Sequence, residues 1–233
     1  MFFGWYFDWT ILIVIPAMLF GLWAQLKVSM TFNKYSQEAT RRNYTGADAA
    51  RRLLDANGLS DVAVDRVPGE LTDHYDPRSR KLFLSESVYD SRSAAAIGVA
   101  CHEAGHAIQH AHNYAPLNLR MQIIPICRFG SGLAMPLFLI GLLIGSEIFG
   151  TYLMMAGIAC FAVASHFQVV TLPVEFNASK RALEGIREAK LLDETELPMA
   201  KKVLTAAAMT YVAALISSLL SLLRLILIAN RRR

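Results

Sequence analysis

The sequence predicts a mainly helical chain in which one α+β module is combined with about four transmembrane helices. Four apolar runs separated by polar segments are each about long enough to cross a bilayer. They are Trp9–Leu26, Phe129–Ser146, Ile148–Ser165 and Val203–Leu223. These runs bring the hydrophobic content to 54% and the mean hydropathy to +0.35, as expected of a protein embedded in lipid. The stretch 28–128 is polar instead and carries both helix and strand patterns.

The first segment, residues 1–27, is expected to be a transmembrane helix that stays attached to the chain. No basic residue precedes its apolar run, and Gln25-Leu26-Lys27 is a poor cleavage site for a signal peptide.

Residues 28–128 predict the α+β module. Thr45-Gly46-Ala47-Asp48 resembles a capping box that opens a helix, and Asn57-Gly58 ends that helix. Alternating valines from Val62 predict a short strand, and Leu71–Tyr75 with Arg80–Ser85 predict a β-hairpin. A second helix over Ser93–Ala111 follows, with Asp90 or Ser91 as its expected cap.

This second helix carries the sequence His102-Glu103-Ala104-Gly105-His106, an HExxH pattern. Residues four apart share one helix face, so the two imidazoles can clamp one Zn²⁺ and leave positions for a third ligand and a water. Glu103 lies between them, where it can act as the general base toward that water. Short patterns also match by chance, so the rest of the chain has to supply a third ligand and a substrate-binding strand.

Two residues compete as the third ligand. His112 has the spacing of an HExxHxxGxxH pattern, but Gln109 stands where that pattern has glycine. A helix continuing past Gln109 would carry His112 roughly 15 Å along the axis from His102, out of range. The predicted transmembrane hairpin, residues 129–172, returns the chain to the same side of the membrane. The helix predicted in segment 173–202 therefore makes Glu175 the preferred ligand.

Composition excludes two other kinds of site. The three cysteines, Cys101, Cys127 and Cys160, have no spacing typical of a disulfide framework or a cysteine metal site. The formal net charge of +4 comes with no basic stripe interleaved with aromatic residues, so nucleic acid is not expected as a partner.

With the HEAGH sequence, the two-span hairpin and Glu175-Phe-Asn-Ala-Ser179, the chain resembles the YugP-like membrane zinc peptidases. More distantly it is similar to the HtpX-like gluzincin proteases. The resemblance implies a zincin-like catalytic module in residues 28–128. In HtpX-like enzymes the third ligand comes from an ExxAD helix, which Glu175 and Ala178 match, whereas Ser179 replaces the aspartate. This departure leaves open which group orients the histidines.

These observations predict a membrane-embedded zinc-dependent endopeptidase. His102, His106 and Glu175 would hold one Zn²⁺, and Glu103 would be the general base toward the activated water. The expected partners are a polypeptide substrate, drawn from membrane or membrane-adjacent proteins, and the lipid bilayer. An exposed strand beside the metal would let a peptide add as a further strand. The alternative is a non-catalytic, zinc-stabilised scaffold, but structural zinc has no need of a base and usually takes four protein ligands.

Basic residues predict the orientation of this multi-pass protein in the cell membrane. Lys27, Arg128 and Lys180 are among many that flank the apolar runs on the side of the module, which places the module in the cytoplasm. The C-terminal transmembrane segment, residues 203–233, ends in Arg231-Arg232-Arg233. These arginines would lie on the opposite side and disagree with this orientation, unless the last run re-enters the membrane or lies in its interface. The sequence does not predict an oligomeric state.

Overall fold

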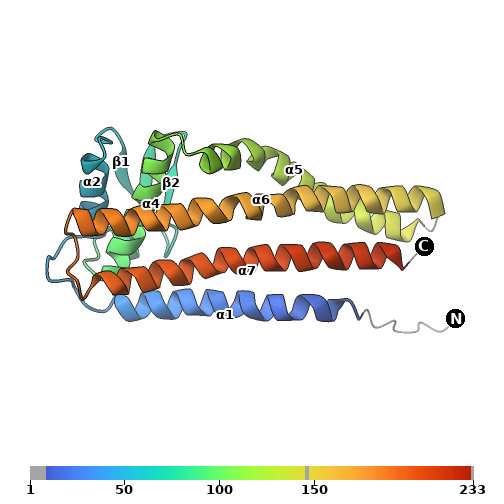
Figure 1. Ribbon diagram of the computed structural model, residues 1–233, viewed down its shortest axis with the longest axis horizontal. Helices are drawn as coiled ribbons and strands as arrows, with labels where there is room; N and C mark the ends of the chain where they lie inside the picture. The colour runs from blue at the N-terminus through green and yellow to red at the C-terminus, as the bar shows by residue number, and fades with distance from the viewer. Residues whose placement is uncertain (1–8, 145–146, 232–233) are drawn as a thin grey trace. The chain divides into compact units, whose positions relative to one another are not determined.

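The computed structural model describes residues 9–144 and 147–231, and it confirms a mainly helical fold. Four long helices are apolar and long enough to cross a membrane: α1 (Ile11–Tyr35), α5 (Ala115–Leu143), α6 (Glu147–Glu188) and α7 (Leu197–Asn230) (Figure 1). All four expose large apolar side chains, including Met18, Leu143 and Ile148. A lipid-facing surface accounts for this exposure. Glu147, which separates the two apolar runs of the predicted hairpin, begins α6, whereas residues 145–146 and the terminal Arg232-Arg233 lie outside the described residues.

Contacts divide the chain into two compact units, with changes after Trp23, Leu119, Val170 and Met209. Among the described residues, the helical unit contains 9–23, 120–144, 147–170 and 210–231. The α+β unit contains everything from Ala24 to Leu119, together with 171–209. The boundaries of these two units fall inside the long helices, so α1, α5, α6 and α7 each contain residues of both units.

Within the α+β unit, the helix α2 (Gly46–Ala56) begins and ends where the sequence predicts. The hydroxyl of Thr45 accepts from the N–H of Asp48, and the Asp48 carboxylate accepts from the N–H of Thr45 at 3.0 Å. Asn57 ends the helix. Ala49, Leu53 and Leu54 are buried on one face, so α2 is anchored by the capping box and by an apolar stripe.

The sheet has the strand order β1-β3-β2, so β2 is an edge strand. β2 (His74–Asp76) pairs antiparallel with β3 (Lys81–Ser85), which confirms the predicted hairpin, and β1 (Ala63–Val67) pairs parallel with β3. Leu82 and Leu84 of β3 point into the core and are fully buried.

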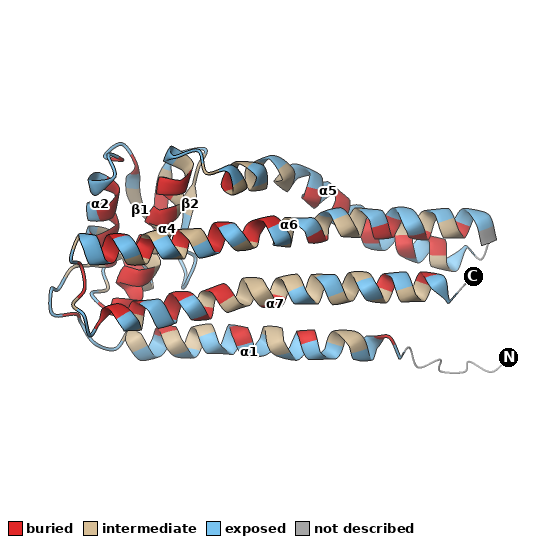
Figure 2. Cartoon of the chain, in the orientation of Figure 1, coloured by how far each residue is buried: buried red, intermediate tan, exposed pale blue. Residues whose placement is uncertain are grey.

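The cap prediction for the following helix is wrong. α4 (Ala94–Ala111) is capped by Ser93, whose hydroxyl accepts from the N–H of Ala96 at 3.2 Å. The residues before Asp90 form a one-turn helix that the sequence did not predict, α3 (Glu86–Tyr89). Asp90 forms an ion pair with Arg66 and does not cap α4. Figure 2 shows α4 as mostly buried within its unit.

The long helix α6 continues through Leu172-Pro173 without a break. The sequence predicts a new polar segment from residue 173, but proline is tolerated inside long membrane helices where neighbouring groups satisfy the freed backbone. Residues on both sides of Pro173 therefore belong to the same helix.

Within the helical unit, α5 and α6 pack closely at glycines. A Cβ on Gly141 would lie 2.6 Å from the carbonyl oxygen of Gly150, and one on Gly157 would lie 2.6 Å from that of Ala134. Glycine allows this close helix contact because it has no side chain. Gly132, by contrast, has open space around it.

Candidate metal centre

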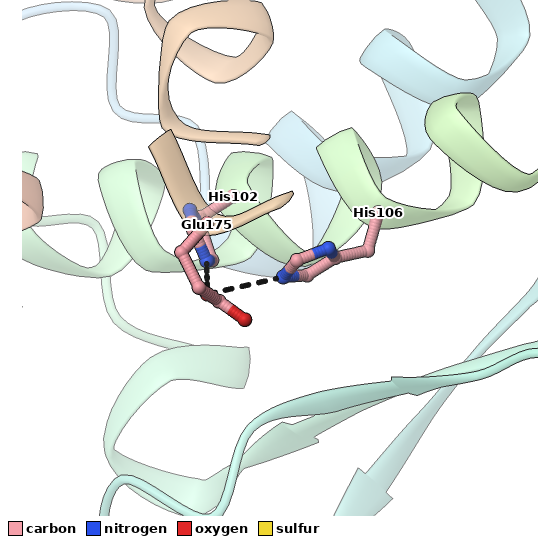
Figure 3. Close-up of side chains that lie close together, drawn as sticks. All are labelled: His102, His106 and Glu175. Atoms are coloured by element: carbon pink, nitrogen blue, oxygen red, sulfur yellow. Dashed lines mark hydrogen bonds and ion pairs between the residues drawn. The ribbon is translucent and has the colours of Figure 1, made fainter. Parts of the chain in front are cut away.

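Three side chains from two helices converge at one point in the α+β unit. α4 presents His102 and His106 one turn apart, and α6 presents Glu175 opposite them (Figure 3). The same carboxylate oxygen, Oε2 of Glu175, lies 3.3 Å from Nε2 of His102 and 3.5 Å from Nε2 of His106. One donor atom from each residue lies within 4.8 Å of the other two. The structure thus brings together the three residues that the sequence selects as ligands.

The two helices approach closely because their contacting faces are small. A Cβ on Gly105 would lie 2.7 Å from the carbonyl oxygen of Ala178, so no larger residue fits there without separating α4 from α6. Ala178 and Ala182 are fully buried on the α6 side. Gly105 lies between the two histidines in sequence, so the close approach occurs where the carboxylate has to reach them. Glu175 is only 1% exposed as a result.

Gln109 fixes the orientation of the His106 ring. Its amide nitrogen donates to the carbonyl oxygen of Val174 at 2.8 Å and to Oδ1 of Asn177 at 2.9 Å. The amide oxygen of Gln109 is therefore the atom that faces His106 Nδ1, at 3.0 Å, and that nitrogen must carry the proton. The lone pair of the ring is left on Nε2, the atom that faces Glu175.

Ser179 has the corresponding position next to His102. Its hydroxyl lies 3.1 Å from His102 Nδ1. This is the residue at which the sequence departs from the ExxAD pattern, and a hydroxyl oxygen can accept from Nδ1–H as an aspartate would. The question left open by the sequence is therefore answered by two groups. Ser179 contacts one imidazole and Gln109 contacts the other.

Glu103 points to the sheet side of α4 and is not part of the three-residue cluster. Its Oε2 accepts from the backbone N–H of Tyr75, on the edge strand β2, at 3.1 Å. Burial raises the pKa of the Glu103 carboxyl, and the nearby Glu175 and Asp73 carboxylates add to this, while His102 and His106 oppose it. A raised pKa brings a carboxyl group closer to what proton transfer at neutral pH requires.

The two remaining histidines of this region lie outside the cluster. His110 is the next residue on the ligand face of α4, and its Nδ1 lies 2.9 Å from the hydroxyl of Tyr75. α4 ends at Ala111, and His112 is its C-terminal cap residue. Nδ1 of His112 lies 3.3 Å from Nη1 of Arg181. Neither histidine belongs to the metal-binding group found among the described residues.

Sequence reasoning missed the roles of Gln109, Asn177 and Tyr75. A signal for Gln109 was present, because it lies three residues after His106 on the same helix face. Comparison with the HExxHxxGxxH pattern, in which this position is glycine, does not reveal its role. Asn177 and Tyr75 had no local signal, since their contacts depend on how α6 and β2 pack against α4.

The donor set fits Zn²⁺. Two imidazole nitrogens and one carboxylate oxygen are the ligands of many catalytic zinc sites, and such sites leave one position for water or substrate. Both imidazoles also have a hydrogen-bond partner on the other ring nitrogen, as zinc-bound histidines almost always do.

The membrane-type helices and this cluster are the features expected of a membrane zinc metallopeptidase, and comparison with known proteins shows the family. Residues 10–230 match the family described as "Putative neutral zinc metallopeptidase", and the chain belongs to this family. It is 50% identical over 218 residues to the "Putative membrane protease YugP" of Bacillus subtilis (strain 168), covering 94% of this chain and 95% of that protein. No solved structure matches the chain. The name of the relative and the four apolar helices indicate a multi-pass membrane protein.

Proposed function

We propose that the chain is a zinc-dependent endopeptidase of the gluzincin type that cuts membrane or membrane-adjacent polypeptides. The observation that carries this proposal is the pairing of the largely buried His102–His106–Glu175 cluster with a separate carboxylate, Glu103, on the neighbouring side of the same helix. A structural zinc site would have no use for that second carboxylate.

In this proposal His102, His106 and Glu175 hold the ion. Zinc in such a site lowers the pKa of a water molecule and polarises a peptide carbonyl. Glu103 takes the proton from the attacking water and passes it to the leaving amine. The N–H of Tyr75 holds the Glu103 carboxylate in place, and Gln109 and Ser179 keep the Nε2 lone pairs of both imidazoles directed at the ion.

The edge strand β2 supplies the substrate-binding element in this proposal. β3 covers one side of β2, and the N–H of Tyr75 points away from β3 toward Glu103. An extended peptide added beside β2 would have its backbone held by main-chain hydrogen bonds close to the general base. Recognition by the backbone favours unfolded or extended segments of many sequences.

The proposed topology is that of a cell-membrane protein whose α+β unit faces the cytoplasm. The support is the excess of basic residues near the membrane ends on that side. The proposed segments are the transmembrane stretches 1–27, 129–172 and 203–233, with the site built from 28–128 and 173–202. A protease added outside intact cells should then remove a tag fused to the C-terminus. Protection of the tag would contradict this orientation.

The test of the proposed function is cleavage of β-casein, an unfolded protein, by the purified zinc-loaded chain and by its Glu103→Gln variant. Zinc content is measured in both samples and has to be equal. We expect wild type to cut and the variant to lose at least about 100-fold in rate, since a general base contributes roughly 10²–10⁴-fold. Two inert proteins that both hold zinc would favour the scaffold alternative. Equal cleavage by both would point to a contaminating protease.

A further inference from the structure

A second candidate site lies in the helical unit, where residues of α5, α6 and α7 line an open cavity of about 500 Å³. Its polar lining comes from all three helices and includes Arg120 and Arg128 of α5, Ser165 and Gln168 of α6, and Ser218 of α7. The hydroxyls of Ser218 and Ser165 lie 2.6 Å apart and join α7 to α6 at this cavity. None of the proposed catalytic residues lines it.

The charged residues that line this cavity are all basic. Arg120 and Arg128 are two turns apart on α5, about 12 Å along the axis, and no acidic residue is among the lining residues. The Arg128 side chain is exposed and has no hydrogen-bond or ion-pair partner among the described residues. The half-buried amide of Gln168 has none either within the same part of the chain. The cavity thus offers a cation and an uncommitted amide to an anionic ligand.

The remaining walls are apolar. Ile124, Phe161 and Phe167 line them, together with the small side chain of Ala164. A free inorganic anion would contact the arginines but would leave these apolar walls exposed to water. A ligand with a charged head and a hydrocarbon tail would satisfy both parts of the cavity.

The position of the cavity along the sequence agrees with such a ligand. Arg128 directly precedes the apolar run that begins at Phe129, and Gln168 follows the run that ends at Ser165. Both therefore lie where the apolar spans end and polar residues begin, the level at which phospholipid headgroups are found. Basic pockets between transmembrane helices at this level bind anionic headgroups.

We propose that this cavity is a binding site for one anionic phospholipid. Arg120, Arg128 and Gln168 contact the phosphate, and an acyl chain lies along the wall formed by Phe161 and Phe167. The site is separate from the proposed metal centre, so neither proposal depends on the other.

The experiment is native mass spectrometry of the full chain in a mild detergent, titrated with dioleoyl phosphatidylglycerol or dioleoyl phosphatidylcholine. We expect the first bound phosphatidylglycerol to half-saturate at a concentration about 10-fold or more below that of phosphatidylcholine. The Arg120→Gln/Arg128→Gln variant should lose most of this preference. Arg128→Gln alone changes only an exposed side chain, is not expected to disturb folding, and should lose part of it.

The matched control is Lys27→Gln/Lys34→Gln, which removes the same charge from α1 near another apolar run. It should keep the preference for phosphatidylglycerol. Equal half-saturation by the two lipids in wild type, or equal losses in the arginine and lysine variants, would overturn the proposal. Displacement of phosphatidylglycerol by millimolar inorganic phosphate would also overturn it, because the cavity would then be a free-phosphate site.

Discussion

Replacing Gln109 should weaken zinc binding without touching a ligand. The side chain is fully buried and takes part in three hydrogen bonds, to His106, Val174 and Asn177. Gln109→Met has nearly the same length but offers no acceptor to His106 Nδ1. The ring is then free to rotate or to place its proton on Nε2, the atom that has to bind the ion. Losing such a partner typically lowers metal affinity by about 10–100-fold.

The same change should also lower stability, and the two effects have to be separated. Three lost hydrogen bonds at about 1 kcal/mol each lower the free energy of unfolding by about 3 kcal/mol. Gln109→Glu is the matched variant, because it keeps an acceptor for His106 but loses both donors. It also places a carboxylate against the oxygens of Val174 and Asn177. Gln109→Glu should therefore be at least as destabilised as Gln109→Met.

The assay is the apparent Kd for Zn²⁺ at pH 7.5, measured by competition with a chelating dye, beside a thermal unfolding curve of each zinc-free protein in detergent. We expect Gln109→Met to lose about 10–100-fold in zinc affinity and Gln109→Glu to stay near wild type, although both melt earlier. If zinc affinity instead falls in parallel with the melting temperature in both variants, Gln109 only supports the fold. An unchanged zinc affinity in Gln109→Met would refute the reasoning directly.

Three further changes test other parts of the structure. Ser179→Ala removes the partner of His102 and should raise the zinc Kd by about 10-fold, while Ser179→Asp should restore it. Gly105→Ala forces a Cβ against an α6 carbonyl and should sharply reduce zinc content in the purified protein; Gly132→Ala, at an open position, should leave it unchanged. Thr45→Ala removes the cap of α2 and should lower the free energy of unfolding by about 1 kcal/mol in a urea titration, with zinc affinity unaffected. Equal zinc loss in the two glycine variants would argue against close packing as the cause.

Features encoded by neighbouring residues could be predicted. The capping box at Thr45 starts α2, the spacing of His102 and His106 puts them on one helix face, and the apolar runs predict the long helices. Each depends on residues within one or a few turns, where propensity and periodicity act directly.

Predictions from local patterns were wrong where contacts between residues distant in sequence determined the structure. Asp90 has the right chemistry for a helix cap, yet it pairs with Arg66, and Ser93 caps α4 instead. Proline is favoured at the first position of a helix, yet α6 continues through Pro173. In both places several outcomes are locally acceptable, and packing against other elements selects one.

The sequence alone determined the donor types of the candidate site and the membrane character of the chain. Tertiary structure decided which groups hold the imidazoles, through the contacts of Gln109 with Val174 and of Ser179 with His102, which join residues 65 and 77 positions apart. It also decided that β2 is the edge strand beside Glu103. The physical reason is that a pattern along one element specifies which face is apolar or polar, whereas the partner of that face is set only when α4, α6 and the sheet pack together.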